Sequence, residues 1–334
     1  AMRAIKRLAQ AVAEIPFQVS DSTGGDASHH LAARLMAQPN PEQERTAFLE
    51  ALVTHLIVTG NAFVEAVSLG GETRELHVLR PDRMRLVTGE GGRIAAYDYT
   101  VGDHSVRFTQ EGLVPPILHI KLPQPFDDHF GLAPLDAAYA AIDIHNSATA
   151  WTKALLDNAA RPSGALVYSG GDGALPEDQY ERLKKELEEG FAGARNAGRP
   201  LLLEGGLDWK PLSLSPKDMD FMEAKNGAAR EIALAIGVPP LVLGIPGDAT
   251  YSNFQEANRA LYRDAALPLA RRIAGALAAW LAPGEALQLS ADEDAIGALG
   301  PDRESLWRRV ERASFLTEGE KREAVGYARD KPEA

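Results

Sequence analysis

A loop rich in proline and glycine, from Gly237 to Asn253, lies between two segments with strong helical patterns. Gly237 predicts the end of the first helix, because glycine readily adopts the left-handed conformation that closes a helix. Pro239 and Pro240 prevent that helix from continuing. The second helix is expected to begin at Ser252, with Gln255 in capping-box spacing. Three prolines and three glycines hold the loop in a non-helical path, and the simplest interpretation is a helix–helix connection.

The composition is that of a globular protein with room for more than one domain. The 334 residues are 45% hydrophobic and 25% charged, and none is cysteine, which excludes disulfides and thiolate zinc sites and makes the cytosol the natural compartment. The net charge of −12 argues against a protein that grips nucleic acid through a basic patch, but not against one that handles DNA without holding it. The longest apolar run, 273–282, is too short for a membrane span, which takes about 20 residues.

The first 130 residues predict an α+β segment. Helical spacing of apolar residues over 5–15 predicts a starter helix, and the polar residues 18–29 predict a loop. A second helix is expected from an Asn40 cap, with Pro41 at its first position, to Gly60. The period then changes to two, which predicts one antiparallel meander. Its strands are expected at 62–67, 75–79, 83–87, 94–99, 105–108 and 113–120.

Two long helices are predicted at 134–161 and 215–236, on either side of a small α/β insert at 163–214. The insert is expected to contain strands at 165–168, 200–203 and 207–212 and a helix at 176–190. Beyond the loop, the longest helix is predicted over 254–281, with a kink at about 264–267 because Pro268 lies inside it. Two short helices are expected at 302–313 and 317–327, the second with a capping box between Thr317 and Glu320.

Motifs for catalysis and cofactor binding are missing. No lysine follows a glycine, so the usual P-loop is excluded, and no Gly-x-Ser-x-Gly, Gly-x-Gly-x-x-Gly or His-Glu-x-x-His occurs. Asp127-Asp128-His129 is the most metal-like cluster, but three consecutive residues rarely converge on one ion. The charge-dense run 181–189 is expected to be a solvated helix face. We therefore predict no catalytic residue, no metal and no cofactor, although no carboxylate can be singled out or dismissed as a general acid or base.

Several motifs, in order, resemble one protein family. They are Gly60-Asn61-Ala62-Phe63-Val64-Glu65, Gly131-Leu132-Ala133-Pro134-Leu135, Ala160-Arg161-Pro162-Ser163-Gly164, Leu202-Leu203-Glu204-Gly205-Gly206, Glu231-Ile232-Ala233 leading into Gly237-Val238-Pro239-Pro240, Thr250-Tyr251-Ser252-Asn253 and Phe315-Leu316-Thr317-Glu318-Gly319-Glu320-Lys321-Arg322. The chain resembles the portal proteins of tailed bacteriophages, in the large family shared by long-tailed phages and gene transfer agents. Each motif is weak alone, and their common order over residues 5–330 carries the resemblance. Ala133 and Gly319 stand where the family often has Ser and Asn.

The resemblance implies a portal fold of named parts. The wing would take residues 1–133, the two antiparallel stem helices 134–162 and 215–237, and the clip 163–214. The tunnel loop would take 238–252, the long kinked wing helix with further wing 253–300, and a short helical crown 301–334.

The function implied by the resemblance is a DNA channel at one capsid vertex. About twelve copies would form a ring that serves genome packaging, head–tail attachment and DNA ejection in a virion or gene transfer agent particle assembled in the host cytoplasm. Double-stranded DNA would pass without sequence specificity. The terminase large subunit, a head–tail adaptor and the major capsid protein are the implied partners, no membrane is involved, and the portal itself would not be an enzyme.

The resemblance also implies which residues face the DNA. The tunnel loop would present Gly244, Ile245, Pro246, Gly247, Asp248, Ala249, Thr250 and Tyr251. Lys153, Lys217 and Lys225 on the stem helices are candidates for phosphate contacts, with salt bridges between subunits as the alternative for each. Val238, Leu241, Val242 and Leu243 are expected to be core. Twelve copies at −12 each carry about −144, and a largely acidic channel would let DNA slide.

Two other classes stay open at this point. A head–tail adaptor or minor capsid protein without a tunnel loop would be monomeric or would form a different ring. A hydrolase that uses scattered carboxylates is the third class, and the missing motifs argue against it.

Overall fold

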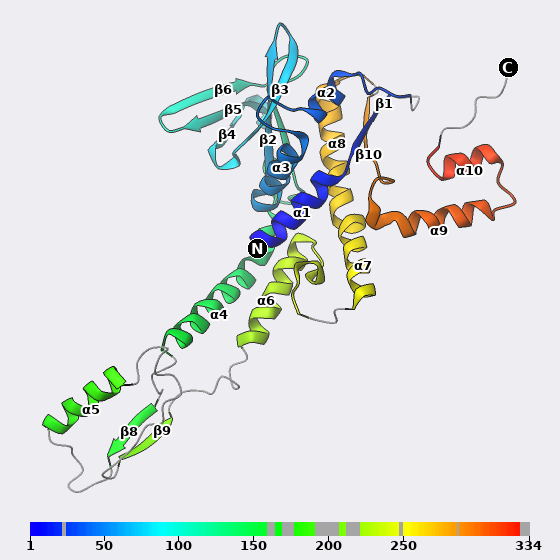
Figure 1. The fold of residues 1–334 in the computed structure, drawn as a ribbon. Helices are drawn as coiled ribbons and strands as arrows, with labels where there is room; N and C mark the ends of the chain where they lie inside the picture. Colours follow the sequence, from blue (N-terminus) through cyan, green and yellow to red (C-terminus); the bar gives the residue numbers. More distant parts are fainter. Residues whose placement is uncertain are drawn as a thin grey trace, which may run out of the picture. The chain divides into compact units, whose positions relative to one another are not determined.

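The computed structural model describes residues 1–21, 25–158, 164–168, 177–190, 207–211, 221–246, 250–285 and 287–327. Two compact units divide the chain: unit 1 combines 1–139 with 230–334, and unit 2 comprises 140–229. The chain therefore leaves unit 1 once, forms unit 2 and returns (Figure 1). Helices and strands occur in both units, which confirms the predicted α+β class.

Three helices build the core of unit 1: α1 (Met2–Glu14), α3 (Arg45–Thr59) and α8 (Leu267–Leu281). α1 contacts both α3 and α8. Their apolar residues recur at three- and four-residue spacing, so each helix has a stripe that is stable only when it is buried. The most deeply buried side chains of these stripes include Ile5, Leu8, Val12, Phe48, Leu52, Leu56, Ile273 and Leu277. Burying each one contributes about 1.5–3 kcal/mol.

α3 begins four residues later than the sequence predicts, so the expected Asn40 cap is wrong. The Asn40 side chain accepts a hydrogen bond from the Glu42 backbone N–H at 3.0 Å and donates one to the Leu76 carbonyl at 2.9 Å. Asn40 thus binds within the turn 40–43 and to β3, and α3 begins only beyond that turn, with Glu44 as its N-cap. Gly60 ends α3 as predicted, with φ of 74°.

Two three-stranded antiparallel sheets follow α3, and the single meander is therefore wrong. In the first sheet, β2 (Asn61–Leu69) lies between β3 (Glu72–Leu79) and β7 (Ile117–Lys121); the second consists of β4 (Met84–Thr88), β5 (Ile94–Val101) and β6 (His104–Thr109) in that order. One apolar cluster contains residues from both sheets: Phe63, Leu79, Met84, Tyr97 and Ile117. β7 returns to β2 because its apolar face is buried in this cluster, a choice that period-two alternation does not encode.

A two-stranded sheet joins the two chain segments that make up unit 1. β1 (Phe17–Ser20) pairs antiparallel with β10 (Gln288–Ala291), and α2 (Leu31–Ala37) follows β1. The loop predicted for residues 18–29 is therefore wrong at its start. Its partner strand lies near the other end of the chain, out of reach of a local pattern.

The helix predicted over 254–281 consists of three elements. α7 (Tyr251–Ala260) leads into a π-helical turn (Leu261–Ala266), and α8 follows with Pro268 in its first turn. The π-helical turn overlaps the kink predicted at about 264–267. Pro268 explains its position, because proline lacks the backbone N–H that would continue regular α-helical hydrogen bonding. Tyr262 in the π-helical turn is buried and donates a hydrogen bond to Glu14 Oε2 of α1 at 2.5 Å. Burial and this bond raise the pKa of Tyr262 to about 12.

Unit 2 contains most of α4 (Tyr139–Asn158), then β8 (Gly164–Tyr168), α5 (Glu177–Gly190) and β9 (Leu207–Pro211), and the first part of α6 (Phe221–Ile236). β8 and β9 pair antiparallel, which confirms the predicted small α/β insert. A 3₁₀ turn at Pro134–Ala138 precedes α4, so that helix starts later than predicted. The strand predicted at 200–203 lies outside the described residues, as does the stretch 212–220 before α6.

The two C-terminal helices are confirmed as α9 (Gly300–Glu311) and α10 (Glu318–Ala324). The capping box between Thr317 and Glu320 is present with both of its hydrogen bonds. Trp307 of α9 meets the Tyr327 ring edge-on at 6.2 Å, and the Arg303 guanidinium lies 5.4 Å from the Trp307 ring centre. These contacts hold α9 near the residues that follow α10.

Candidate functional site

The candidate site is the loop between α6 and α7. Gly237 ends α6 with φ of 81°, as predicted. The Gly237 N–H donates to the Leu234 carbonyl at 2.9 Å, and the Val238 N–H donates to the Ala233 carbonyl at 2.8 Å. Together these bonds form a Schellman motif, which satisfies the last carbonyls of α6 and sets the direction in which the loop leaves.

The proline pair then starts a single 3₁₀ turn, Pro240–Leu243, which closes at Gly244 with φ of 72°. Val238 and Leu243 are buried, whereas Leu241 and Val242 are half-buried. The expectation that these four residues are core therefore holds fully for two of them. The turn anchors the base of the loop in unit 1 through apolar contacts.

The predicted DNA-facing residues begin where this anchor ends. Gly244 and Pro246 are exposed, and Ile245 is half-buried. Thr250 is exposed, and Tyr251 is 78% exposed. The other three predicted loop residues, Gly247, Asp248 and Ala249, lie outside the described residues.

The second helix begins one residue before the predicted Ser252. Thr250 is its cap, and the Thr250 hydroxyl accepts a hydrogen bond from the Asn253 N–H at 3.2 Å. Ser252 instead exchanges a hydrogen bond with that hydroxyl at 3.2 Å. Threonine and serine are both good caps, so the position of the chain, not residue preference, decides between them.

One contact of the loop was not expected from the sequence. The Arg230 guanidinium, on α6, donates a hydrogen bond to the Pro246 carbonyl. A helix-borne arginine thus holds the loop at the last residue before the undescribed tip. No local signal in the sequence points to this contact, because Arg230 lies before the last turn of α6 and its partner is sixteen residues away.

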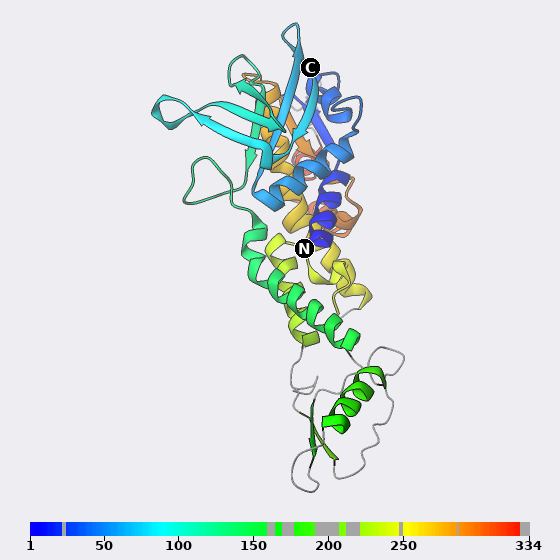
Figure 2. The ribbon, with the colours of Figure 1, turned by 90° about the vertical axis from the view of Figure 1, so that its left-hand side faces the viewer.

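All three candidate lysines belong to unit 2, and Lys217 lies outside the described residues. Lys153 is exposed on α4, and Lys225 is half-buried on α6. The pKa of His145 on α4 is lowered by burial and by the positive charge of Lys225, so these two side chains are near one another. α4 and α6 accordingly run side by side in opposite directions within unit 2 (Figures 1 and 2).

The Asp127-Asp128-His129 stretch forms a turn. Asp127 Oδ1 accepts hydrogen bonds from the backbone N–H groups of His129 at 2.7 Å and Phe130 at 3.0 Å. These bonds hold the pKa of Asp127 below its usual value. Across the described residues, no group of three or more His, Cys, Asp or Glu side chains is arranged to hold a metal ion.

Comparison with known proteins identifies the family. The family model described as "Phage portal protein" matches residues 1–326. The chain belongs to the phage portal protein family. Among curated relatives of this portal, a protein of Rickettsia bellii is 39% identical over 333 residues, covering 98% of this chain and 86% of its own length. The portal protein of Enterobacteria phage HK97 is 26% identical, covering 87% of this chain and 66% of its own length.

Solved structures agree with this assignment. The chain matches a structure titled as the neck of the empty gene transfer agent (GTA) particle with a TM-score of 0.80 and 50% identity, covering 98% of this chain and 90% of that one. A structure of the neck of the native GTA particle, computed with C12 symmetry, matches at a TM-score of 0.77 and the same identity and coverage. An HK97-family portal from Corynebacterium diphtheriae shares the fold, at a TM-score of 0.58 and 15% identity over 88% of this chain and 92% of that one. Within the described part of this portal, no helix is long and apolar enough to cross a membrane.

Proposed function

We propose that this portal subunit assembles with about eleven further copies into a ring that forms the DNA channel at one vertex of a phage or gene transfer agent capsid. The observation that carries the proposal is the 50% identity, over 98% of the chain, to a protein of a GTA particle neck solved with C12 symmetry. Membership of a portal family argues against the adaptor, the minor capsid protein and the hydrolase. We also propose that the portal subunit has no enzymatic activity of its own.

The parts of the ring follow the family pattern. We assign residues 1–133 and 253–300 to the wing, 134–162 and 215–237 to the two stem helices, and 163–214 to the clip. Residues 238–252 would form the tunnel loop, and 301–334 the crown. Support comes from the helix–insert–helix order of α4, β8, α5, β9 and α6.

The tunnel loop is the proposed DNA-facing element. Its base is fixed by the Schellman motif and the 3₁₀ turn, whereas Pro246 and Tyr251 beside its tip are exposed. Apolar and backbone groups suit a pore, because they contact DNA without reading its sequence. Lys153, Lys217 and Lys225 are proposed as scattered phosphate contacts, with salt bridges to the next subunit as the alternative.

The acidic net charge of the chain is consistent with DNA that slides through the channel without being held. A channel that bound phosphates through many cations would release counterions, hold DNA tightly and stall it. A net charge of −12 per subunit opposes such binding. The terminase large subunit, a head–tail adaptor and the major capsid protein are the proposed partners, with assembly in the host cytoplasm.

The test is mass photometry of the purified protein across concentration and salt, followed by negative-stain imaging. Rings with a central hole and about twelve-fold symmetry are expected. A protein that stays monomeric both alone and when co-expressed with its capsid and adaptor genes would refute the proposed ring. An ATPase assay on the same sample is expected to give no signal above buffer.

A further inference from the structure

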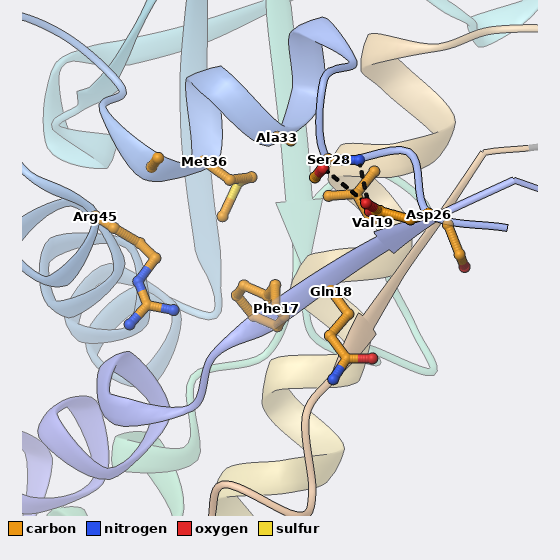
Figure 3. A pocket seen from close by; sticks show the side chains of 10 residues that line it. Phe17, Gln18, Val19, Asp26, Ser28, Ala33, Met36 and Arg45 are labelled. Atoms are coloured by element: carbon orange, nitrogen blue, oxygen red, sulfur yellow. Dashed lines mark hydrogen bonds between the residues drawn. The ribbon is translucent and has the colours of Figure 1, made fainter. Parts of the chain in front are cut away.

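A groove of about 580 Å³ opens in unit 1 between β1, α2 and the start of α3 (Figure 3). Phe17 and Val19 lie two apart on β1 and therefore share one face of the strand. Met36 lines the groove from α2, on the side opposite Phe17 (Figure 3). The centre of the groove is thus apolar, and a ring or aliphatic side chain would fit it. The Asp26 carboxylate lines the end of the groove away from the cation described below and accepts two hydrogen bonds from Ser28 (Figure 3).

A cation stands at one end of the groove. The guanidinium of Arg45, the first residue of α3, donates one hydrogen bond to the Ile15 carbonyl at 3.2 Å. No carboxylate in the described parts of the chain forms an ion pair with Arg45. Since guanidinium has five N–H donors, most of them remain available to a ligand in the groove.

A complementary protrusion, residues 126–128 and called the knob below, lies on the connection between β7 and the 3₁₀ turn at Pro134. Phe126 in this connection is 96% exposed, the most exposed large apolar side chain among the described residues. The two hydrogen bonds to Asp127 Oδ1 and a further bond from Lys121 Nζ to the Asp128 carbonyl brace the backbone around it. A braced loop loses little entropy when it binds, which favours a docking role over a disordered one.

The knob, residues 126–128, also carries a negative charge, opposite in sign to Arg45 at one end of the groove. The Asp127 carboxylate is occupied inside the turn, but the Asp128 carboxylate forms no ion pair with any described cation. Phe126 and Asp128 therefore present an apolar group and a free anion two residues apart. The groove presents an apolar centre and the available cation of Arg45.

Knob and groove lie on opposite sides of unit 1. In Figure 2, the connection after β7 extends to the left, whereas α2, which forms one wall of the groove, lies on the right. A subunit cannot fill its own groove in this arrangement. Two different complementary surfaces on opposite sides are what a head-to-tail, ring-closing interface requires.

We propose that Phe126 of one subunit inserts between Phe17 and Met36 of the next copy in the ring, and that Asp128 pairs with Arg45 there. The inference rests on the proposed ring. A buried aromatic anchor beside a charged pair at its edge is the usual form of an interface hot spot. The partner is thus a second copy of this chain, not an adaptor or capsid protein.

Disulfide trapping tests the contact, and the absence of native cysteine removes any background. The double variant Pro125→Cys with Ala37→Cys keeps Phe126 and places one thiol beside it, at the edge of the knob, and one on the exposed rim of the groove. Mild oxidation of its rings is expected to give a ladder of covalent oligomers on a denaturing gel. Leu69→Cys with Ala37→Cys is the control, since Leu69 is 73% exposed at the tip of the β2–β3 hairpin, and it is expected to stay monomeric on the gel.

Charge reversal supplies an independent test without cysteine. Asp128→Arg and Arg45→Glu, each alone, are expected to raise the protein concentration needed for ring formation by about threefold to tenfold. The two changes together are expected to restore assembly, which a folding defect would not do. Rings that form without a ladder and without this rescue would overturn the contact and leave the ring standing, whereas loss of rings in the unsubstituted protein would refute the ring itself.

Discussion

The side chain of Asn61 joins the start of β2 to Gly131, seventy residues later in the chain. Asn61 Oδ1 accepts the Gly131 N–H at 2.7 Å, and Asn61 Nδ2 donates to the Thr59 carbonyl at 2.7 Å. Asn61 is 5% exposed, so these bonds are shielded from water. The junction fixes the backbone just before the 3₁₀ turn that leads into α4.

Close backbone approach explains why glycine occupies both sides of this junction. A Cβ on Gly131 would lie 2.2 Å from the Gly60 carbonyl oxygen and 2.6 Å from the Leu122 nitrogen. Backbone atoms cannot yield to such contacts as a flexible side chain would. Gly131→Ala is expected to destabilise unit 1 by about 2–4 kcal/mol, measured by urea denaturation.

Gly275→Ala is the matched control for that substitution. Gly275 is exposed within α8, and its added Cβ would meet nothing within 4 Å. Alanine is the better helix former by about 1 kcal/mol, so this variant is expected to be as stable as the unsubstituted protein or more so. Equal stability of the two variants would contradict the close approach of Gly60 and Gly131.

Because of the buried His119, the folded protein is expected to become less stable in acid. Its ring stacks on Phe63 with centroids 4.3 Å apart, and its Nε2 donates to Asn61 Oδ1 at 2.9 Å. Burial, with a smaller effect from Lys121, lowers the pKa of His119 from 6.5 to about 4. Because the unfolded chain takes up this proton near pH 6.5 and the folded chain only near pH 4, stability is expected to fall as the pH drops through that window.

The size of this effect is on the order of 2 kcal/mol, less than the full shift because the ring is only half-buried. Urea denaturation between pH 7 and pH 4 measures it. His119→Gln keeps a donor but cannot titrate, and is expected to flatten this part of the pH profile. An unchanged profile in that variant would assign the acid sensitivity to other groups.

Arg230 is expected to limit the mobility of the proposed tunnel loop. Its hydrogen bond to the Pro246 carbonyl joins the loop to α6. Arg230→Ala is expected to speed amide exchange severalfold over residues 244–251, with less than about 1 kcal/mol lost in global stability. Arg230→Lys keeps a donor and is expected to exchange more slowly than the alanine variant; identical exchange in all three proteins would show that the bond does not restrain the loop.

Positive charge in the loop is expected to slow DNA. Tyr251→Lys together with Ile245→Lys would add twenty-four cations to a ring of twelve, next to the proposed path of the phosphates. Stronger phosphate binding is expected to lower the DNA content of particles severalfold at low salt and less at high salt. Leu69→Lys on the β2–β3 hairpin is the control, and equal DNA content in all particles would argue against a loop that faces the DNA.

The local pattern of the sequence was sufficient for most individual elements. Apolar spacing placed α1 and α3 with their buried faces, because a helix stripe depends only on neighbours three and four residues apart. Gly60 and Gly237 were recognisable as helix ends, since each needs the left-handed conformation that glycine allows. The Thr317–Glu320 capping box is equally local.

Only the tertiary structure decided how these elements combine. β7 pairs with β2 and not with β6, and β1 pairs with β10. These pairings depend on which apolar faces are buried together and not on distance along the sequence. Asn40 braces β3 instead of capping α3, and Arg230 binds Pro246, because their partners are brought near only by the fold. Sequence order thus determined the family and the elements, while burial in three dimensions determined the sheet pairing, the Gly60–Gly131 junction and the restraint on the loop.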